Sequence, residues 1–233
     1  RGFGATETID SLTSTKACAW VSGHTNYTVG GTLTFRNIDG FFFRGIGAGQ
    51  GYRTRFTWAG NTTDPCFLLE NVGIGSTLEQ FAVVCSTGKP LAKAFRLINA
   101  TGNTILSSAR IFRNLILIGT NGGLTDGFSY EVGSGGNTNN DSDTYDNVRV
   151  ANYSQYGWHL NASQSVGHCF YRCVGESNRY GQAAVGIDAG NISAWIGGTM
   201  AGNTVADFYA VNMGAYPLLI AGVISENSTS FFR

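Results

Sequence analysis

The 233-residue sequence has little charge and lacks the marks of several common functional classes. Charged residues make up 13% of the chain, about half of average usage, and 15 basic residues balance 15 acidic ones. No run of Lys or Arg occurs, so the positive surface that binds nucleic-acid phosphates is missing. The longest apolar stretch, residues 216–224, is too short to span a membrane. We therefore expect neither nucleic acid as a main partner nor membrane insertion.

Cysteine is present, but in a pattern that excludes two further classes. An odd number with irregular spacing matches neither a disulfide framework nor a paired Cys-x-x-Cys metal site. An extended strand would hold Cys169 and Cys173 roughly 13 Å apart, which is beyond the reach of a disulfide. We expect no metal and no cofactor, and we expect the five cysteines to be small core residues: Cys18, Cys66, Cys85, Cys169 and Cys173.

The chain is instead rich in glycine, with 33 residues, while 42% of it is hydrophobic. That apolar content argues against a disordered chain. Short runs of alternating apolar and polar residues, closed by Gly, Asn, Asp or Ser, predict short strands with turns between them. Gly and Asn interrupt these runs before three helical turns are complete, which argues against helical repeats.

An internal repeat organises the predicted strands. Residues 194–204 align with residues 218–228 at an offset of 24, which places Ile196 on Ile220 and Asn203 on Asn227. A step back of 25 residues places Asn178 below Asn203. Further steps of 25, 33 and 34 residues lead from Cys173 through Val148 and Leu115 to Phe81. Such in-register similarity predicts stacked coils of parallel strands, about 4.8 Å apart, with like residues above like.

A second row of alternating segments begins each repeat, at residues 94–98, 127–131, 157–161, 186–188 and 207–212. We predict that Phe95, Phe128, Trp158 and Ile187 stack inside. The fold class that follows is all-β, a right-handed single-stranded parallel β-helix of about seven coils, with a β-sandwich or jelly roll as the alternative. Residues 1–60 would form the N-terminal lead-in and first coils. Residues 61–233 would form the body of one continuous domain, a fragment of a longer chain.

The N-terminal third resembles the opening of the pectin-lyase-like superfamily. The residues that carry the resemblance are 27–35 (YTVGGTLTF), 45–51 (GIGAGQG) and 54–60 (TRFTWAG). The pattern is most similar to that of bacteriophage tailspikes and related polysaccharide depolymerases. The clustered Asp motifs of polygalacturonases and the calcium cluster of pectate lyases are missing. The resemblance implies a β-helix at an extracellular or virion surface, a homo-oligomer (a trimer) and a polysaccharide ligand.

A polar stripe on one predicted sheet is the candidate site. Glu131 and Asp188 would lie two coils apart, roughly 9 to 10 Å, close to the carboxyl separation of inverting glycosidases. His159 would lie between them and would orient a water or tune a pKa. Glu131, Asp188 and His159 are thus the candidate catalytic residues. The candidate substrate-binding residues on the same stripe are Arg96, Ser129, Asn161 and Asn212.

Two other interpretations of the polar residues remain open. A solvent-exposed strand face carries polar residues whether or not it binds a ligand, and Asp141, Asp143 and Asp146 form a second acidic group. The sequence predicts a tailspike-like β-helix that binds a bacterial surface polysaccharide and, as a glycoside hydrolase or polysaccharide lyase, would cleave it. The alternative is a non-enzymatic structural or adhesive β-helix of a virion or cell-surface protein.

Overall fold

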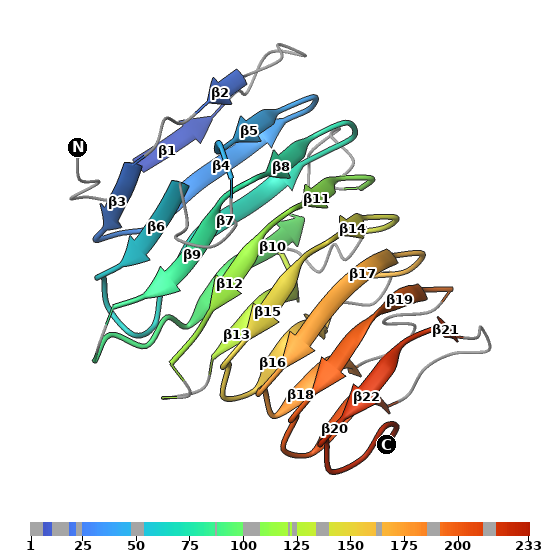
Figure 1. Cartoon of the computed structure of the whole chain (residues 1–233). Helices are drawn as coiled ribbons and strands as arrows, with labels where there is room; N and C mark the ends of the chain where they lie inside the picture. The colour runs from blue at the N-terminus through green and yellow to red at the C-terminus, as the bar shows by residue number, and fades with distance from the viewer. Residues whose placement is uncertain are drawn as a thin grey trace.

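The computed structural model shows an all-β chain, as predicted (Figure 1). It contains 22 strands and no helix within the residues that it describes. None of these residues forms a helix that could cross a membrane. The described residues are 7–10, 19–21, 25–47, 54–86, 88–99, 108–120, 122, 125–133, 140–161, 165–185, 192–211 and 218–233.

One sheet has eight strands, and every neighbouring pair in it is parallel. Each strand pairs with a strand that lies two or three elements further along the chain, so the sheet grows in sequence order. Its strands are β1 (Glu7–Asp10), β4 (Leu33–Ile38), β7 (Pro65–Val72), β10 (Lys93–Asn99), β13 (Asp126–Val132), β16 (Tyr156–Leu160), β18 (Tyr180–Val185) and β20 (Ala206–Val211).

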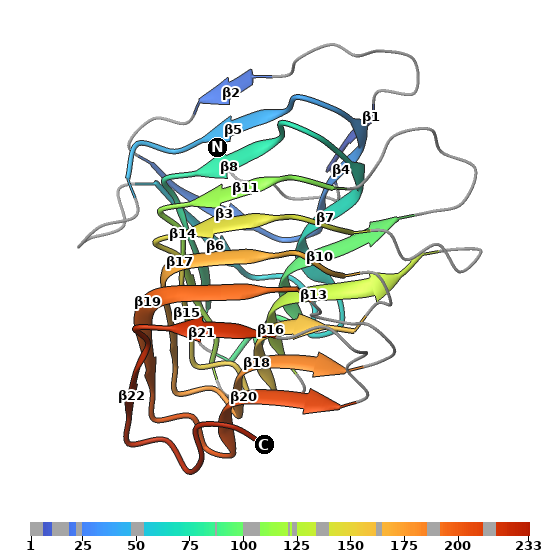
Figure 2. The same cartoon turned by 90° about the vertical axis from the view of Figure 1, so that its right-hand side faces the viewer.

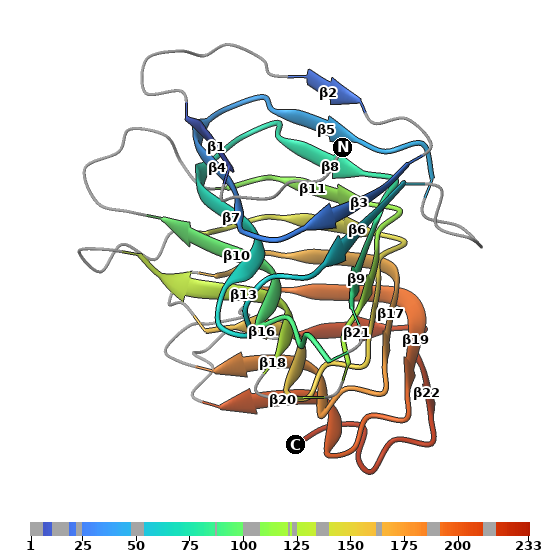
Figure 3. The ribbon, with the colours of Figure 1, turned by 90° about the vertical axis from the view of Figure 1, so that its left-hand side faces the viewer.

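The other sheet consists of two rows of parallel strands, which Figures 2 and 3 show from opposite sides. One row holds β2 (Ala19–Val21), β5 (Phe42–Arg44), β8 (Thr77–Glu79), β11 (Ile111–Arg113), β14 (Thr144–Asp146) and β21 (Leu219–Ala221). The other holds β3 (Thr25–Val29), β6 (Thr54–Trp58), β9 (Ala82–Cys85), β12 (Ile116–Ile118), β15 (Arg149–Ala151) and β22 (Ile224–Glu226). Two long strands run through both rows, β17 (Cys169–Glu176) and β19 (Ala194–Ala201).

The register of these pairs confirms most of the repeat read from the sequence. Phe112 pairs with Tyr145, Leu117 with Val83, and Cys173 with Gly198. The strands therefore recur in parallel at the offsets that the sequence predicted, an arrangement compatible with a parallel β-helix. The predicted inward residues of this sheet are fully buried at six positions: Phe112, Leu115, Leu117, Val148, Val150 and Cys173.

Backbone corners with a left-handed conformation separate the strands. Asn114 (φ 51°) and Asn147 (φ 54°) occupy equivalent positions after β11 and β14, and Gly197 (φ 66°) occupies that position in β19. Asn and Gly accept this conformation more readily than other residues do. Asn147 Nδ2 donates to Asn114 Oδ1 at 2.8 Å, so the corner side chains also stack on one another. This explains why Asn and Gly recur at fixed places in the sequence.

Aromatic side chains fill the interior in columns that cross from strand to strand. Phe95 stacks on Phe128 with ring centroids 4.9 Å apart, and Phe128 stacks on Trp158 at 6.1 Å, as predicted. A second column on the other sheet places Phe170 between Tyr145, at 4.8 Å, and Trp195, at 4.5 Å. The columns meet edge to face, an arrangement that aromatic quadrupoles favour.

Charged side chains pair between successive strands on both sheets. Glu79 lies between Arg44 and Arg113, with Oε1 to Arg44 Nε at 3.4 Å and Oε2 to Arg113 Nε at 3.1 Å. Arg36 and Glu70 form a similar pair at 2.8 Å on the eight-stranded sheet. Cross-strand pairs of opposite charge favour one register over a slipped one, which would oppose like charges.

The prediction that Ile187 follows Trp158 in the inward stack is wrong. The residue that pairs with Trp158 is Gln182, which is 2% exposed, and Ile187 lies outside the described residues. The connection before β18 is five residues shorter than the alternation suggested. A glutamine can take the inward place because its Oε1 accepts a hydrogen bond from Trp195 Nε1.

The predicted register of the last repeat is wrong by one residue. Trp195 pairs with Ile220 and Thr199 with Ile224, an offset of 25 rather than 24. A shift of one residue moves a side chain to the other face, and Ile196 is accordingly 42% exposed rather than buried. Ile220 is partly buried against the core.

The predicted stack of three asparagines changes with it. Asn178 and Asn203 do stack, since the Asn178 N–H donates to Asn203 Oδ1 at 3.1 Å. The next residue in the column is Ser228, whose Oγ accepts from the Asn203 N–H at 3.1 Å. Asn227 instead occupies an exposed left-handed corner with φ 55°. Serine and asparagine both offer a side-chain oxygen as acceptor. The alignment of Asn203 with Asn227 therefore predicted the wrong register, because Ser228 takes the place of the third asparagine.

The cysteine prediction holds in part. All four described cysteines are free. Cys66 and Cys173 are buried, whereas Cys85 and Cys169 are partly exposed. Cys18 lies outside the described residues.

Candidate functional site

The stripe predicted from the sequence lies on the face of the eight-stranded sheet, and we call it the outer stripe: Arg96, Ser129, Glu131, His159 and Asn161. Arg96 pairs in register with Ser129, and Ser129 with His159. Asn161 follows β16 and is exposed. The other two predicted members, Asp188 and Asn212, lie outside the described residues, so the expected Glu131–Asp188 spacing stays a prediction.

Glu131 is an ionised carboxylate held by its neighbours. Its oxygens lie 3.2 Å from Lys93 Nζ and 2.8 Å from Arg96 Nε, and the Ser129 hydroxyl donates to it at 2.9 Å. Burial acts to raise its pKa, but these two charges and the Ser129 hydrogen bond outweigh burial and lower the pKa of Glu131 below its usual value. In this form Glu131 can accept a proton or attack as a nucleophile, but it cannot serve as a general acid at neutral pH.

His159 contacts a carboxylate that the sequence analysis did not select. Its Nδ1 lies 3.3 Å from Asp126 Oδ2, and its ring stacks on Tyr156 with centroids 4.0 Å apart. The rings of Tyr180 and Tyr209 continue this row. Asp126 begins β13 and pairs in register with Tyr156, a position that the alternation of the strand did not assign to the outer face.

The second acidic group does not form one site. Asp143 is fully buried against Arg110, and Asp146 is paired with Arg172 on the surface. Asp141 is partly buried. The loss of solvent around its carboxyl group is the main reason that its pKa is raised to about 6. Asp143 and Asp146 therefore face opposite sides of the same strand segment.

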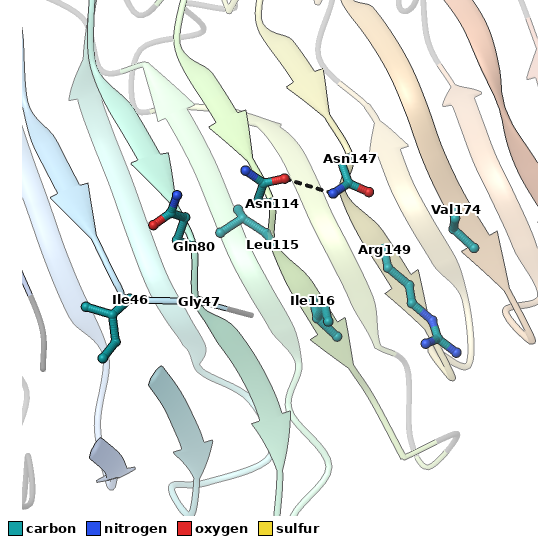
Figure 4. A pocket seen from close by; sticks show the side chains of 9 residues that line it. All are labelled: Ile46, Gly47, Gln80, Asn114, Leu115, Ile116, Asn147, Arg149 and Val174. Carbon is teal, nitrogen blue, oxygen red and sulfur yellow. Dashed lines mark hydrogen bonds between the residues drawn. The ribbon is translucent and has the colours of Figure 1, made fainter. Parts of the chain in front are cut away.

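A groove of about 430 Å³ opens on the 14-stranded sheet, away from the outer stripe. We call it the amide groove. Figure 4 shows Gln80, Asn114 and Asn147 in a row along it, with the hydrogen bond between the two asparagines. The complete lining is Ile46, Gly47, Gln80, Asn114, Leu115, Ile116, Asn147, Arg149 and Val174.

Two rows of equivalent residues build the amide groove. The first row stands at left-handed corners between the strands: Gln80 (φ 63°), Asn114 (φ 51°) and Asn147 (φ 54°). The second row lies two residues beyond each corner, where Ile116 at the start of β12 pairs with Arg149 at the start of β15, and Arg149 pairs with Val174 within β17. Two steps along the groove therefore carry both an amide and a larger side chain, Asn114 with Ile116 and Asn147 with Arg149.

The amides of the groove are only partly used by the protein. Asn114 Oδ1 accepts from Asn147, and Gln80 Oε1 accepts from Arg44 Nε at 3.0 Å. Arg149 is paired with Glu176. Within the described part of the chain this leaves the NH₂ groups of Gln80 and Asn114 as donors and the Asn147 Oδ1 as an acceptor. Side by side, they can bind a ligand rich in hydroxyl groups.

Sequence reasoning aligned Asn114 with Asn147 but did not identify them as a site. The signal that could have identified the site was a third amide, Gln80, at the equivalent position of the preceding repeat. Their common orientation depends on the left-handed corners, which the sequence does not specify at Gln80.

No family model, curated protein or solved structure matches the chain. Among the described residues, no group of three or more His, Cys, Asp or Glu is placed to hold a metal ion.

Proposed function

We propose that the chain is a right-handed single-stranded parallel β-helix that binds a polysaccharide in the amide groove. The observation that carries the proposal is the row of Gln80, Asn114 and Asn147 on three successive strand connections. Each amide combines a donor and an acceptor in one plane, which suits the hydroxyl pairs of a sugar ring. A volume of about 430 Å³ is in the usual size range of ligand sites.

The lining favours a neutral sugar. Arg149 is the one charged residue of the groove, and Glu176 already pairs with it. Ile46, Ile116 and Val174 add apolar surface, against which the C–H face of a sugar can pack. The zero net charge of the whole chain agrees with a ligand of this kind.

Binding without cleavage is the form of the proposal that the groove supports. Hydrolysis of a glycosidic bond ordinarily uses two carboxyl groups, and no Asp or Glu lines the groove. A second candidate function is cleavage at the outer stripe, favoured by the ionised Glu131 and the contact between Asp126 and His159. In both cases we propose that the protein acts at an extracellular or virion surface, as the resemblance to tailspikes implies.

The groove is tested by removing one amide without straining its corner. In Asn147→Gly the left-handed backbone is kept, because glycine adopts it freely. The matched control is Asn227→Gly, at an exposed corner with nearly the same φ, 55° against 54°. A glycan array would first identify a ligand, and calorimetry would then compare the three proteins.

We expect Asn147→Gly to weaken binding by roughly tenfold, the effect of one or two lost hydrogen bonds, and Asn227→Gly to bind as the wild type does. Product analysis on the same ligand separates binding from cleavage. Equal affinity of all three proteins, or no glycan bound at all, would refute the proposed groove. Cleavage lost in Glu131→Gln would instead favour the outer stripe.

A further inference from the structure

A column of buried polar residues lies inside the molecule, away from the amide groove and the outer stripe. Arg110, Asp143, His168 and Ser193 each stand one residue before a strand, and those strands pair with one another. Each of the four is at most 1% exposed. Polar groups so deeply buried need hydrogen-bond partners.

The carboxylate of Asp143 is fully used. It accepts from the Arg110 backbone N–H at 2.9 Å, from Arg110 Nε at 3.0 Å and from Arg110 Nη2 at 2.7 Å. The Tyr130 hydroxyl donates to it as well. The Asp143 N–H in turn donates to His168 Nδ1 at 3.2 Å. No further donor in the column can be satisfied by this carboxylate.

Two nitrogen donors near Asp143 are left without a partner among the described residues, Arg110 Nη1 and Asn140 Nδ2. His168 Nδ1 accepts a hydrogen bond, so the ring proton of the neutral imidazole is on Nε2. Burial, above all, keeps the ring neutral by lowering the pKa of His168 to about 4. The side chains of Arg110 and Asn140 are in contact, because Arg110 Nη2 donates to Asn140 Oδ1 at 3.1 Å.

Two hydroxyl groups without partners complete the set, Ser165 Oγ and Ser193 Oγ. Ser165 follows Asn140 by 25 residues, the same offset that pairs Thr144 with Cys169. Ser193 stands one strand beyond His168 at the same corner. The unpaired groups are spread along this corner over four successive strands, roughly 14 Å from Arg110 to Ser193 at about 4.8 Å per strand, and donors outnumber acceptors among them. Each group left unpaired would cost about 1–3 kcal/mol.

We propose that this corner binds a small monovalent anion of the chloride class, held by Arg110 Nη1 and Asn140 Nδ2. An anion accepts several N–H and O–H groups and brings no proton of its own. A water molecule would bring two protons, which would need acceptors of their own. The positive charge of Arg110 strengthens hydrogen bonds from its guanidinium to an anion, which offsets the cost of burying a second negative charge near Asp143. The site is independent of the proposed glycan groove.

The first test is thermal unfolding of the full chain in salts of equal ionic strength. With chloride or bromide about tenfold above its dissociation constant, we expect the melting temperature to be roughly 3 to 6 °C higher than in a bulky anion such as gluconate. Crystals grown with bromide should show an anomalous peak within hydrogen-bonding distance of Arg110 Nη1 and Asn140 Nδ2. Equal melting temperatures in all salts, with only water at the corner, would overturn the proposal.

The second test supplies the acceptor from the protein. Asn140→Asp replaces Nδ2 by an oxygen beside Arg110, so this variant should lose the halide effect and the bromide peak. Asn227→Asp makes the same change at an exposed corner and should keep both. A halide effect of full size in Asn140→Asp would assign it to another place and refute this site. If Asn140→Asp does not fold, the wild-type salt series and the bromide map still decide the question.

Discussion

The length of the repeat is uneven in the N-terminal half and nearly uniform in the C-terminal half. Along the row from β5 to β14 paired residues are 33 to 35 positions apart: Phe42 pairs with Thr77, Thr77 with Ile111, and Ile111 with Thr144. Other strand pairs of this half are closer, such as Ala19 with Phe42 at 23 positions and Thr25 with Thr54 at 29. From Thr144 onward the step is 25 residues, through Cys169 and Ala194 to Leu219. The connections shorten accordingly, from residues 86–92 between β9 and β10 to residues 177–179 between β17 and β18.

The interiors of the two halves differ as the connections do. Phenylalanine fills the N-terminal half, where Phe67 lies among the rings of five others. Both halves also bury amides. In the N-terminal half Asn71 Nδ2 donates to Asn37 Oδ1 at 2.9 Å, whereas buried amides of the C-terminal half donate to backbone carbonyls. Asn178 Nδ2 donates to the Val150 carbonyl at 3.1 Å, and Asn203 Nδ2 donates to the Gly175 carbonyl at 3.0 Å. The difference shows that a tight corner brings unpaired backbone groups inward, and that an amide side chain satisfies them.

The largest expected effect is the loss of a ring from the N-terminal interior. Phe67 is fully buried, and the centroids of the rings around it lie 4.9 to 6.2 Å away. Phe67→Ala should lower the free energy of unfolding by about 3–5 kcal/mol, since it leaves a cavity in a closely packed cluster. Urea denaturation measures the loss. The control Phe231→Ala removes a ring that is 42% exposed and should cost far less; equal costs would contradict the contrast in packing.

A polar substitution tests the C-terminal interior. Asn203 also accepts from the Asn178 N–H and donates to Asp207 Oδ1 at 2.8 Å. Asn203→Leu keeps a similar volume but leaves these groups and the Gly175 carbonyl unpaired, so we expect a loss of about 2–4 kcal/mol. Leu69→Met in the N-terminal interior, a swap of like volume without polar groups, should cost under about 1.5 kcal/mol. A stable Asn203→Leu protein would show that the amides are dispensable.

The free energy of unfolding should depend on pH through His168, which lies at the boundary between the two halves. His168 follows Asp143 by the first 25-residue step, and burial lowers its pKa to about 4. Between pH 6.5 and 4 the unfolded chain therefore binds a proton that the folded chain refuses, so acid lowers stability by up to about 3 kcal/mol.

His168→Asn isolates this effect. The asparagine oxygen can still accept from the Asp143 N–H, but it does not titrate. The difference in unfolding free energy between wild type and variant should change across this pH range. Asp141, whose raised pKa of about 6 acts in the opposite sense, cancels in that difference. A difference that does not vary with pH would show that His168 titrates alike in both states.

The smallest effect on the fold itself is expected at the surface of the last strands. Ile196, Leu219 and Ile224 are 42%, 55% and 57% exposed, whereas the same face in the N-terminal half carries ion pairs. We propose that further copies of the chain cover these residues in a trimer. Ile196→Lys should then dissociate the trimer in light scattering and change the stability of the monomer by less than about 0.5 kcal/mol. A wild-type chain that is monomeric at all concentrations would rule out this assembly.

Particular residues show how far the sequence led toward the fold. The alignments of Phe112 with Tyr145 and of Phe95 with Phe128 were readable because apolar side chains stack like on like. The burial of Gln182 could not be predicted from the sequence, because it depends on a hydrogen bond with Trp195, 13 residues away. The exposed Ile196 was misassigned because one residue in the length of a turn reverses the face of every following side chain.

The candidate sites were likewise predictable only in part from the sequence. The sequence by itself determined an all-β chain of parallel, repeating strands and the identity of the residues on the outer stripe, because alternation and repeat length are local properties. Only the tertiary structure paired His159 with Asp126, buried Asp143 against Arg110 and aligned three amides along a groove. These contacts join residues about 30 positions apart, so the packing of one repeat on the next decides them.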